Sequence, residues 1–94
     1  MSAPVFVSRT RREVTVRKGE RPGKVVAAAL QAMREARGLT QADLGRRLGV
    51  SQQRVAHLES PQSNPTIAMV DRYAAACGEE LVVVWDPQNK GANK

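Results

Sequence analysis

Two consecutive glutamines, Gln52 and Gln53, are the side chains with the clearest capacity to recognise a ligand. Ala56 and His57 follow them at a spacing of four, so all four side chains share one outward face if this segment is a helix. A glutamine amide can bond adenine N6 and N7 together, and a short alanine can touch a thymine methyl. We therefore predict that Gln52, Gln53, Ala56 and His57 contact DNA bases, with a plain solvated helix face as the alternative.

Hydroxyl groups and arginines near this face are suited to phosphate. Thr40 and Ser51 each precede an expected helix, and a hydroxyl beside the N–H groups of a helix start suits an anion. Arginines position a protein along the phosphate backbone. The phosphate contacts expected from these residue types are Thr40, Ser51, Arg54, Arg46 and Arg47. For Arg46 and Arg47, a solvated helix face explains the charges equally well.

The sequence offers no arrangement of residues suited to catalysis or to a metal. It contains one histidine and one cysteine, and neither a GxxxxGK[ST] nor a GxGxxG motif occurs. Cys77 therefore has no intrachain disulfide partner, and its apolar setting is typical of a small core residue. No apolar run approaches the roughly 18 residues that a membrane span needs. We expect a cytoplasmic protein that binds no cofactor, metal or membrane and catalyses no reaction.

Four helices are expected to position these side chains. They cover residues 25–37, 40–48, 52–60 and 67–77. Each of the last three has a hydroxyl residue in the N-cap position, namely Thr40, Ser51 and Thr66. Val55 and Leu58 lie three apart and point away from the glutamine face, so they should anchor the third helix to the core.

Residues 81–85, with the sequence LVVVW, predict a strand buried on both faces. The backbone groups of a strand need a partner, which is either the same strand of a second chain or one of two short runs, residues 5–7 and 14–16. The fourth helix carries two apolar stripes, one of which could face another subunit. The predicted dimer interface comprises Met69, Tyr73, Leu81, Val82, Val83, Val84 and Trp85.

The charge of the 94-residue chain is unevenly placed. Residues 1–24 hold seven basic and two acidic side chains, whereas residues 25–86 hold six basic and seven acidic ones. The net charge of +6 therefore lies mainly in the two ends of the chain. A basic arm suits a polyanion such as DNA, and a solvated, flexible arm is the alternative.

Residues 39–60, LTQADLGRRLGVSQQRVAHLES, resemble the helix-turn-helix of the Cro/repressor-type (XRE) family. The likeness extends over residues 25–78 and includes the order of the four helices. Beyond residues 39–60 it includes Pro65-Thr66 and residues 75–78. It implies a mainly α fold, a four-helix domain followed by a short C-terminal β-strand, with the second helix of the motif in the DNA major groove.

The same resemblance implies roles for three further residues. A side chain at the start of the second helix binds phosphate in this family, and Gln41 stands at that position. Phage repressors of this type pair an arginine of the first helix with a glutamate at the end of the third. The matching residues are Arg34 and Glu59, for which we expect a partly buried ion pair.

A short helix-turn-helix protein that ends in an apolar strand also resembles the antitoxins of Hip and Hig toxin–antitoxin systems. In the Hip type this strand pairs with its copy across a dimer, and residues 80–85 fit that role. In some Hig-type antitoxins a segment before the helix-turn-helix binds the toxin, and residues 1–24 could do so by adding a strand to a toxin's sheet.

We accordingly expect a homodimeric repressor that binds a near-palindromic operator in double-stranded DNA, and we expect it to be an antitoxin that controls its own operon. The alternatives are a stand-alone or phage-type regulator and a protein-interaction module that no longer binds DNA. The expected segments are a basic arm (1–24, flexible or short strands), a helix-turn-helix domain (25–78), a dimerisation strand (79–86) and a flexible tail (87–94).

Overall fold

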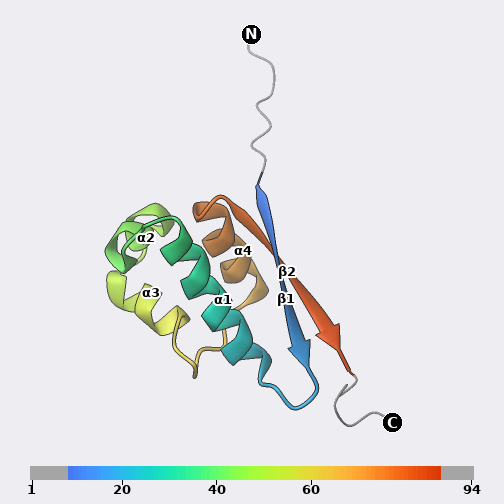
Figure 1. Ribbon diagram of the computed structural model, residues 1–94. Coiled ribbons are helices and arrows are strands. Elements are labelled where there is room, and N and C mark those ends of the chain that lie inside the picture. Colours follow the sequence, from blue (N-terminus) through green and yellow to red (C-terminus); the bar gives the residue numbers. More distant parts are fainter. Residues whose placement is uncertain (1–8, 88–94) are drawn as a thin grey trace.

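The computed structural model describes residues 9–87, in which four helices are flanked by a strand at each end of the chain (Figure 1). The elements in order are β1 (Thr10–Arg17), α1 (Pro22–Ala36), α2 (Gln41–Leu48), α3 (Gln52–Leu58), α4 (Ile67–Ala76) and β2 (Glu79–Asp86). The predicted mainly α fold, with four helices and a C-terminal strand, is confirmed. The predicted strand run 5–7 and most of the predicted tail lie outside the described residues.

The helix boundaries follow local backbone chemistry. α1 begins at Pro22, three residues before the expected start at residue 25, because proline has no N–H and a fixed φ that suit the first helical turn. The hydroxyl oxygens of Thr40, Ser51 and Thr66 each accept a backbone N–H at the start of α2, α3 and α4. α2 ends at Gly49, whose φ of 74° is a left-handed conformation that favours glycine.

The core is formed where all four helices meet. Its buried members include Leu30, Met33, Leu44, Val55, Leu58, Tyr73, Ala74 and Cys77. Val55 has no exposed surface and Leu58 only 2%, so the back of α3 is anchored as its sequence pattern predicted. Cys77 is 2% exposed and serves as a small core residue.

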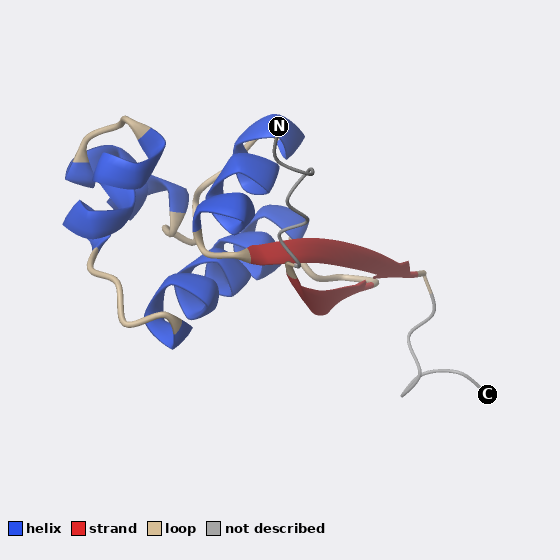
Figure 2. Cartoon of the chain, turned by 90° about the horizontal axis from the view of Figure 1, so that it is seen from above, coloured by secondary structure: helices blue, strands red, loops and turns tan. Residues whose placement is uncertain are grey.

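β1 and β2 form a parallel two-stranded sheet within one chain. Thr10 lies opposite Glu79 and Arg17 lies opposite Asp86. Figure 2 shows that both strands lie to one side of the helices and project beyond them. β1, which contains the predicted run 14–16, is thus the partner on one edge of β2, as one of the two alternatives had it, and pairing of β2 with its own copy in a dimer stays a prediction. The segment predicted as a basic arm, residues 1–24, includes β1, in keeping with the short strands given for it as an alternative, and also the start of α1.

Charged groups fasten β1 to the rest of the fold. Glu79, which is 2% exposed, accepts hydrogen bonds from Arg12 Nε at 2.6 Å and Arg12 Nη2 at 3.2 Å. Nε of Arg37, the residue that follows α1, lies 3.8 Å from the same carboxylate, and Arg9 Nε donates to the Glu79 carbonyl at 2.9 Å. A two-stranded sheet is marginal on its own, so these contacts and the burial of Val16 explain why β1 stays paired.

Candidate nucleic-acid interface

α2 and α3 are joined by a tight turn that depends on close backbone approach. A Cβ added to Gly45 would lie 2.7 Å from the Val50 carbonyl oxygen and 3.3 Å from the Ser51 carbonyl carbon. Gly45 therefore allows α2 to contact the turn, and this contact fixes the angle at which α3 leaves it. The two helices form a helix-turn-helix, the arrangement that places a second helix in the DNA major groove.

The outward face of α3 carries the four side chains predicted to contact bases. Gln52, Gln53, Ala56 and His57 are all exposed, while the opposite face of α3 is buried in the core. The structure therefore brings these four residues together on one short, accessible helix. Arg54 is also exposed on α3, between the second glutamine and the buried Val55.

The predicted phosphate ligands Thr40 and Ser51 stand at the starts of α2 and α3. The Thr40 hydroxyl accepts the Asp43 N–H at 3.0 Å, and the Asp43 carboxylate accepts the Thr40 N–H at 3.0 Å. Hydrogen bonds to the Asp43 carboxylate from the Thr40 backbone N–H and then from its hydroxyl lower the pKa of Asp43 and keep it charged. Ser51 Oγ accepts the Arg54 N–H at 3.0 Å. As an acceptor of the Arg54 N–H, the Ser51 hydroxyl keeps its own proton available for an anion.

The two arginines of α2 have different surroundings. Arg46 forms an ion pair with Asp43 one turn earlier, and its side chain is 73% exposed. Arg47 Nη1 donates to the Ala76 carbonyl at 2.9 Å, at the C-terminal end of α4. Arg47 is nevertheless exposed, so this contact leaves its expected phosphate role a prediction. Neither sequence spacing nor residue type indicated this contact.

One buried carboxylate, that of Glu59, connects three helices. Arg34 Nε of α1 donates to Glu59 Oε2 at 2.7 Å, and Arg34 Nη2 donates to Oε1 at 3.0 Å. Gln41 Nε2 of α2 donates to Oε1 at 3.1 Å, and the hydroxyl of Tyr73 on α4 donates to Oε2. The ion pair implied by the resemblance is therefore present, within a larger network than the sequence indicated.

The network shifts the titration of both of its acidic members. Burial raises the pKa of Glu59, but hydrogen bonds from Arg34, Tyr73 and Gln41 outweigh it, so the net pKa is lowered. Burial, and then the hydrogen bond to Glu59, raise the pKa of Tyr73 far above its ordinary value. Glu59 is therefore the charged member and Tyr73 the neutral donor over the whole physiological range.

Gln41 keeps its predicted position at the start of α2. One of its amide N–H groups is taken by Glu59, and an amide nitrogen carries two such donors. The second N–H can therefore serve a phosphate, and Glu59 fixes the direction of the side chain. In this way the buried network holds a residue at the edge of the candidate interface.

The predicted dimer-interface residues separate into three groups. Tyr73 has no exposed surface and lies inside the chain's own core, so it is not available to a second chain, which corrects that prediction. Met69 and Leu81 pack partly against the core, and Val82 and Val84 are half-buried. Val83 and Trp85 are exposed by 47% and 57%.

Neither a metal nor a membrane site is evident in the described part of the chain. Residues 9–87 contain no group of three or more His, Cys, Asp or Glu side chains that could hold a metal ion. Within the same range, every helix is too short or too polar to cross a bilayer.

Comparison with known proteins identifies the fold family. The family model described as helix-turn-helix matches residues 30–84, more than half of the chain, from the middle of α1 to Val84 of β2. No curated protein and no solved structure matches the chain. β1 lies outside the matched range. The chain belongs to the helix-turn-helix family of the Cro/XRE type, whose members are DNA-binding transcription regulators.

Proposed function

We propose that this protein is a sequence-specific repressor of transcription that inserts α3 into the major groove of double-stranded DNA. The observation that carries the proposal is the exposed face of α3, which presents the amides of Gln52 and Gln53. The opposite face of the helix is buried in the core. The major groove admits one α-helix, and base edges there present the donors and acceptors that an amide can match. Each bidentate contact is worth about 1–3 kcal/mol of discrimination against a wrong base.

In this proposal the residues around α3 divide into two roles. Gln52, Gln53, Ala56 and His57 contact base edges. The phosphate ligands are Thr40, Gln41, Ser51, Arg54 and Arg46. Phosphate contacts position a protein on the duplex without selecting a sequence, so only the first group should decide which operator is bound.

We also propose that the repressor works as a homodimer on a near-palindromic operator. One helix of seven residues contacts too few base pairs to select a single site, so a second copy of α3 is needed. In symmetric dimers of this kind the two recognition helices lie one DNA turn apart, roughly 34–36 Å.

The proposal is tested by selecting bound duplexes from a random DNA library. We expect one near-palindromic sequence to be enriched and to stay preferred as the salt concentration rises. Gln52→Ala and Gln53→Ala should relax the preference at adjacent base pairs, whereas Gln31→Ala on the exposed side of α1 should not. Enrichment of no sequence, or equal loss of all binding with salt, would contradict sequence-specific binding.

We further propose that this repressor is the antitoxin of a type II toxin–antitoxin pair and that it represses its own operon. Its support is the resemblance to Hip- and Hig-type antitoxins together with β1 and β2, which lie beside the four helices. The test expresses the adjacent gene alone and with this chain. Growth arrest by the adjacent gene that this chain relieves is expected, and an adjacent gene without toxicity would leave a stand-alone regulator as the assignment.

A further inference from the structure

Two arginines form reciprocal hydrogen bonds between the C-terminal ends of α2 and α4. Arg72 Nη2 of α4 donates to the carbonyl of Leu48, the last residue of α2, at 2.8 Å in a partly buried contact. Arg47 Nη1 of α2 donates to the carbonyl of Ala76, the last residue of α4, at 2.9 Å. The last carbonyls of a helix lack an N–H partner within it and form the negative end of its dipole, so a guanidinium suits both positions.

The two contacts attach α2 to α4 at two separate points. Arg47 and Leu48 are adjacent at the end of α2, whereas Arg72 and Ala76 are four residues apart and lie on one face of α4. A single hydrogen bond would let one helix rotate about it, but two bonds at separate points resist that rotation. The direction of the last turn of α2 therefore depends on α4.

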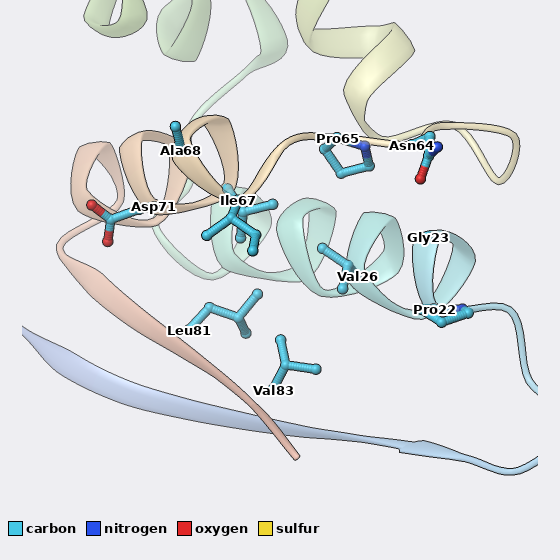
Figure 3. A pocket seen from close by; sticks show the side chains of 11 residues that line it. Pro22, Gly23, Val26, Asn64, Pro65, Ile67, Ala68, Asp71, Leu81 and Val83 are labelled. Atoms are coloured by element: carbon cyan, nitrogen blue, oxygen red, sulfur yellow. The ribbon is translucent and has the colours of Figure 1, made fainter. Parts of the chain in front are cut away.

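The first half of α4 is only partly enclosed by the rest of the fold. A groove of about 780 Å³ lies between the start of α1, this part of α4 and β2 (Figure 3). Ile67 and Asp71 of α4 line the groove, and Ile67 is 89% exposed. Because packing is incomplete on this side, the polar contacts that α4 makes with α2 matter more for the relative placement of the two helices.

The direction of α2 determines the direction in which α3 begins. Leu48 is followed by a turn of three residues, 49–51, and then by α3. Within this turn the Val50 N–H donates to the Gly45 carbonyl of α2 at 2.9 Å. The turn is thus fixed to the last part of α2, so a rotation of α2 on α4 would tilt α3 with it.

The end of α3 is also attached to α4, through the residue next to Arg72. The hydroxyl of Tyr73 donates to the carboxylate of Glu59, which directly follows α3. Two adjacent residues of α4 therefore contact the segments on both sides of α3. Arg72 binds the chain just before the turn, and Tyr73 binds it just after the helix.

We propose that Arg72 is a positioning residue of the DNA-binding site, which sets the angle of α3 through the Leu48 carbonyl and does not itself contact DNA. The inference rests on the proposed base contacts of α3 and names a residue that determines how accurately they are placed. Hydrogen bonds to base edges weaken steeply when their geometry is poor, and they alone select a sequence. Loss of Arg72 should therefore reduce discrimination between sequences more than general affinity for DNA.

The test selects bound duplexes from a random DNA library with the wild type and with Arg72→Ala, at a temperature at which both are folded. The ratio of the affinities for the selected operator and for an unrelated duplex should fall at least about fivefold in the variant, which corresponds to about 1 kcal/mol of base discrimination. The slope of log affinity against log salt should stay unchanged. A slope reduced by about 1 would identify Arg72 as a phosphate ligand and overturn the inference.

Two further variants separate positioning from a general loss of stability. Arg72→Lys keeps a charged donor for a single carbonyl, so it should recover most of the affinity ratio. Arg12→Ala removes the hydrogen bonds between β1 and Glu79, and should lower the thermal midpoint without changing that ratio. A ratio that falls equally in Arg12→Ala would assign the effect to stability and overturn the inference. No recovery in Arg72→Lys would overturn it as well.

The wild-type selection distinguishes failure of this inference from failure of the proposed function. If the wild type enriches no sequence, α3 does not select bases, and both proposals are wrong. If the wild type enriches an operator and Arg72→Ala prefers it to the same degree, the proposed base contacts stand and only the positioning role of Arg72 is wrong.

Discussion

Arg34 and Glu59 face each other in a two-point contact, with Arg34 Nε and Nη2 lying 2.7 and 3.0 Å from the two carboxylate oxygens. The contact joins the last turns of α1 to the residue that follows α3. Because α3 has only seven residues, its direction depends on what holds its two ends. The ion pair therefore connects the stability of the core to the placement of the proposed base contacts.

Removing one side of this pair should strongly destabilise the fold. Glu59→Ala leaves the Arg34 guanidinium buried without its carboxylate, which typically costs about 3–5 kcal/mol when a pair is fully buried. The side chains of Arg34 and Glu59 are 11% and 3% exposed, so we expect a cost near the lower end. Urea denaturation measures it, with Glu35→Ala as the control because that side chain is 59% exposed. Wild-type stability in Glu59→Ala would show that the pair is dispensable.

The same carboxylate predicts how stability falls in acid. Glu59 has a lowered pKa in the fold, so it adds stability above the ordinary glutamate value of 4.5. That stability is lost as the pH falls through the lower folded pKa, because the proton then removes the partner of Arg34. Thermal midpoints from pH 2 to pH 6 should show this loss, and Glu59→Gln should show a flatter curve. If the wild type and Glu59→Gln lose stability equally steeply in acid, groups other than Glu59 cause the loss.

Tyr73 predicts a second loss of stability, in alkali. Its pKa is raised in the fold, so above the ordinary tyrosine value of 10.0 the unfolded chain releases a proton that the folded chain keeps. Stability should therefore decrease as the pH rises above that value. Tyr73 is the only tyrosine, so the near-ultraviolet absorbance of tyrosinate reports its deprotonation alone. Absorbance should appear together with unfolding, and its appearance in a folded protein would be evidence against burial.

Arg47 and Arg54 should respond differently to the same substitution. Arg54→Ala removes a proposed phosphate contact, so affinity should fall for all duplexes and the slope of log affinity against log salt should decrease by about 1. Arg47→Ala removes the bond to the Ala76 carbonyl and should lower the thermal midpoint without changing that slope. Titration of one duplex at several salt concentrations measures both. A reduced slope in Arg47→Ala would show that Arg47 also contacts phosphate.

Arg12 should determine whether β1 stays in place. Arg12→Ala leaves the Glu79 carboxylate, whose side chain is 3% exposed, with only Arg37 at 3.8 Å. We expect faster amide hydrogen exchange throughout β2, with the helices less affected. Arg11→Ala is the matched control. The side chain of Arg11, next in the sequence, is 67% exposed and makes only a loose ion pair with Glu13, at 3.9 Å. Equal exchange in the two variants would show that apolar contacts alone hold the strand.

The helices could be predicted from the sequence because their signals are local. Thr40 and Ser51 cap the helices that their positions predicted, and the apolar spacing of Val55 and Leu58 matches their burial. The family resemblance supplied the Arg34–Glu59 pair, which no local pattern could reveal.

The pairing of β1 with β2 could not be predicted in the same way. Arg12 and Glu79 are 67 positions apart, and a β-branched run fits many partners equally well. Tyr73 was misplaced because an apolar stripe shows that a face is covered, but not whether the same chain or another covers it. The hydrogen bond of Arg47 could not be predicted either, because the carbonyl that accepts it lies on another helix.

The pairing of the first strand with the last determines the order in which parts of the chain can fold during synthesis. All four helices leave the ribosome before β2 does, and their mutual contacts include the recognition unit of α2 and α3. β1 is made first but cannot pair until the last described residues have emerged, and closing so long a loop is entropically costly. The helices that contain the proposed DNA-binding unit can thus fold early, whereas β1 stays unpaired until β2 has been synthesised.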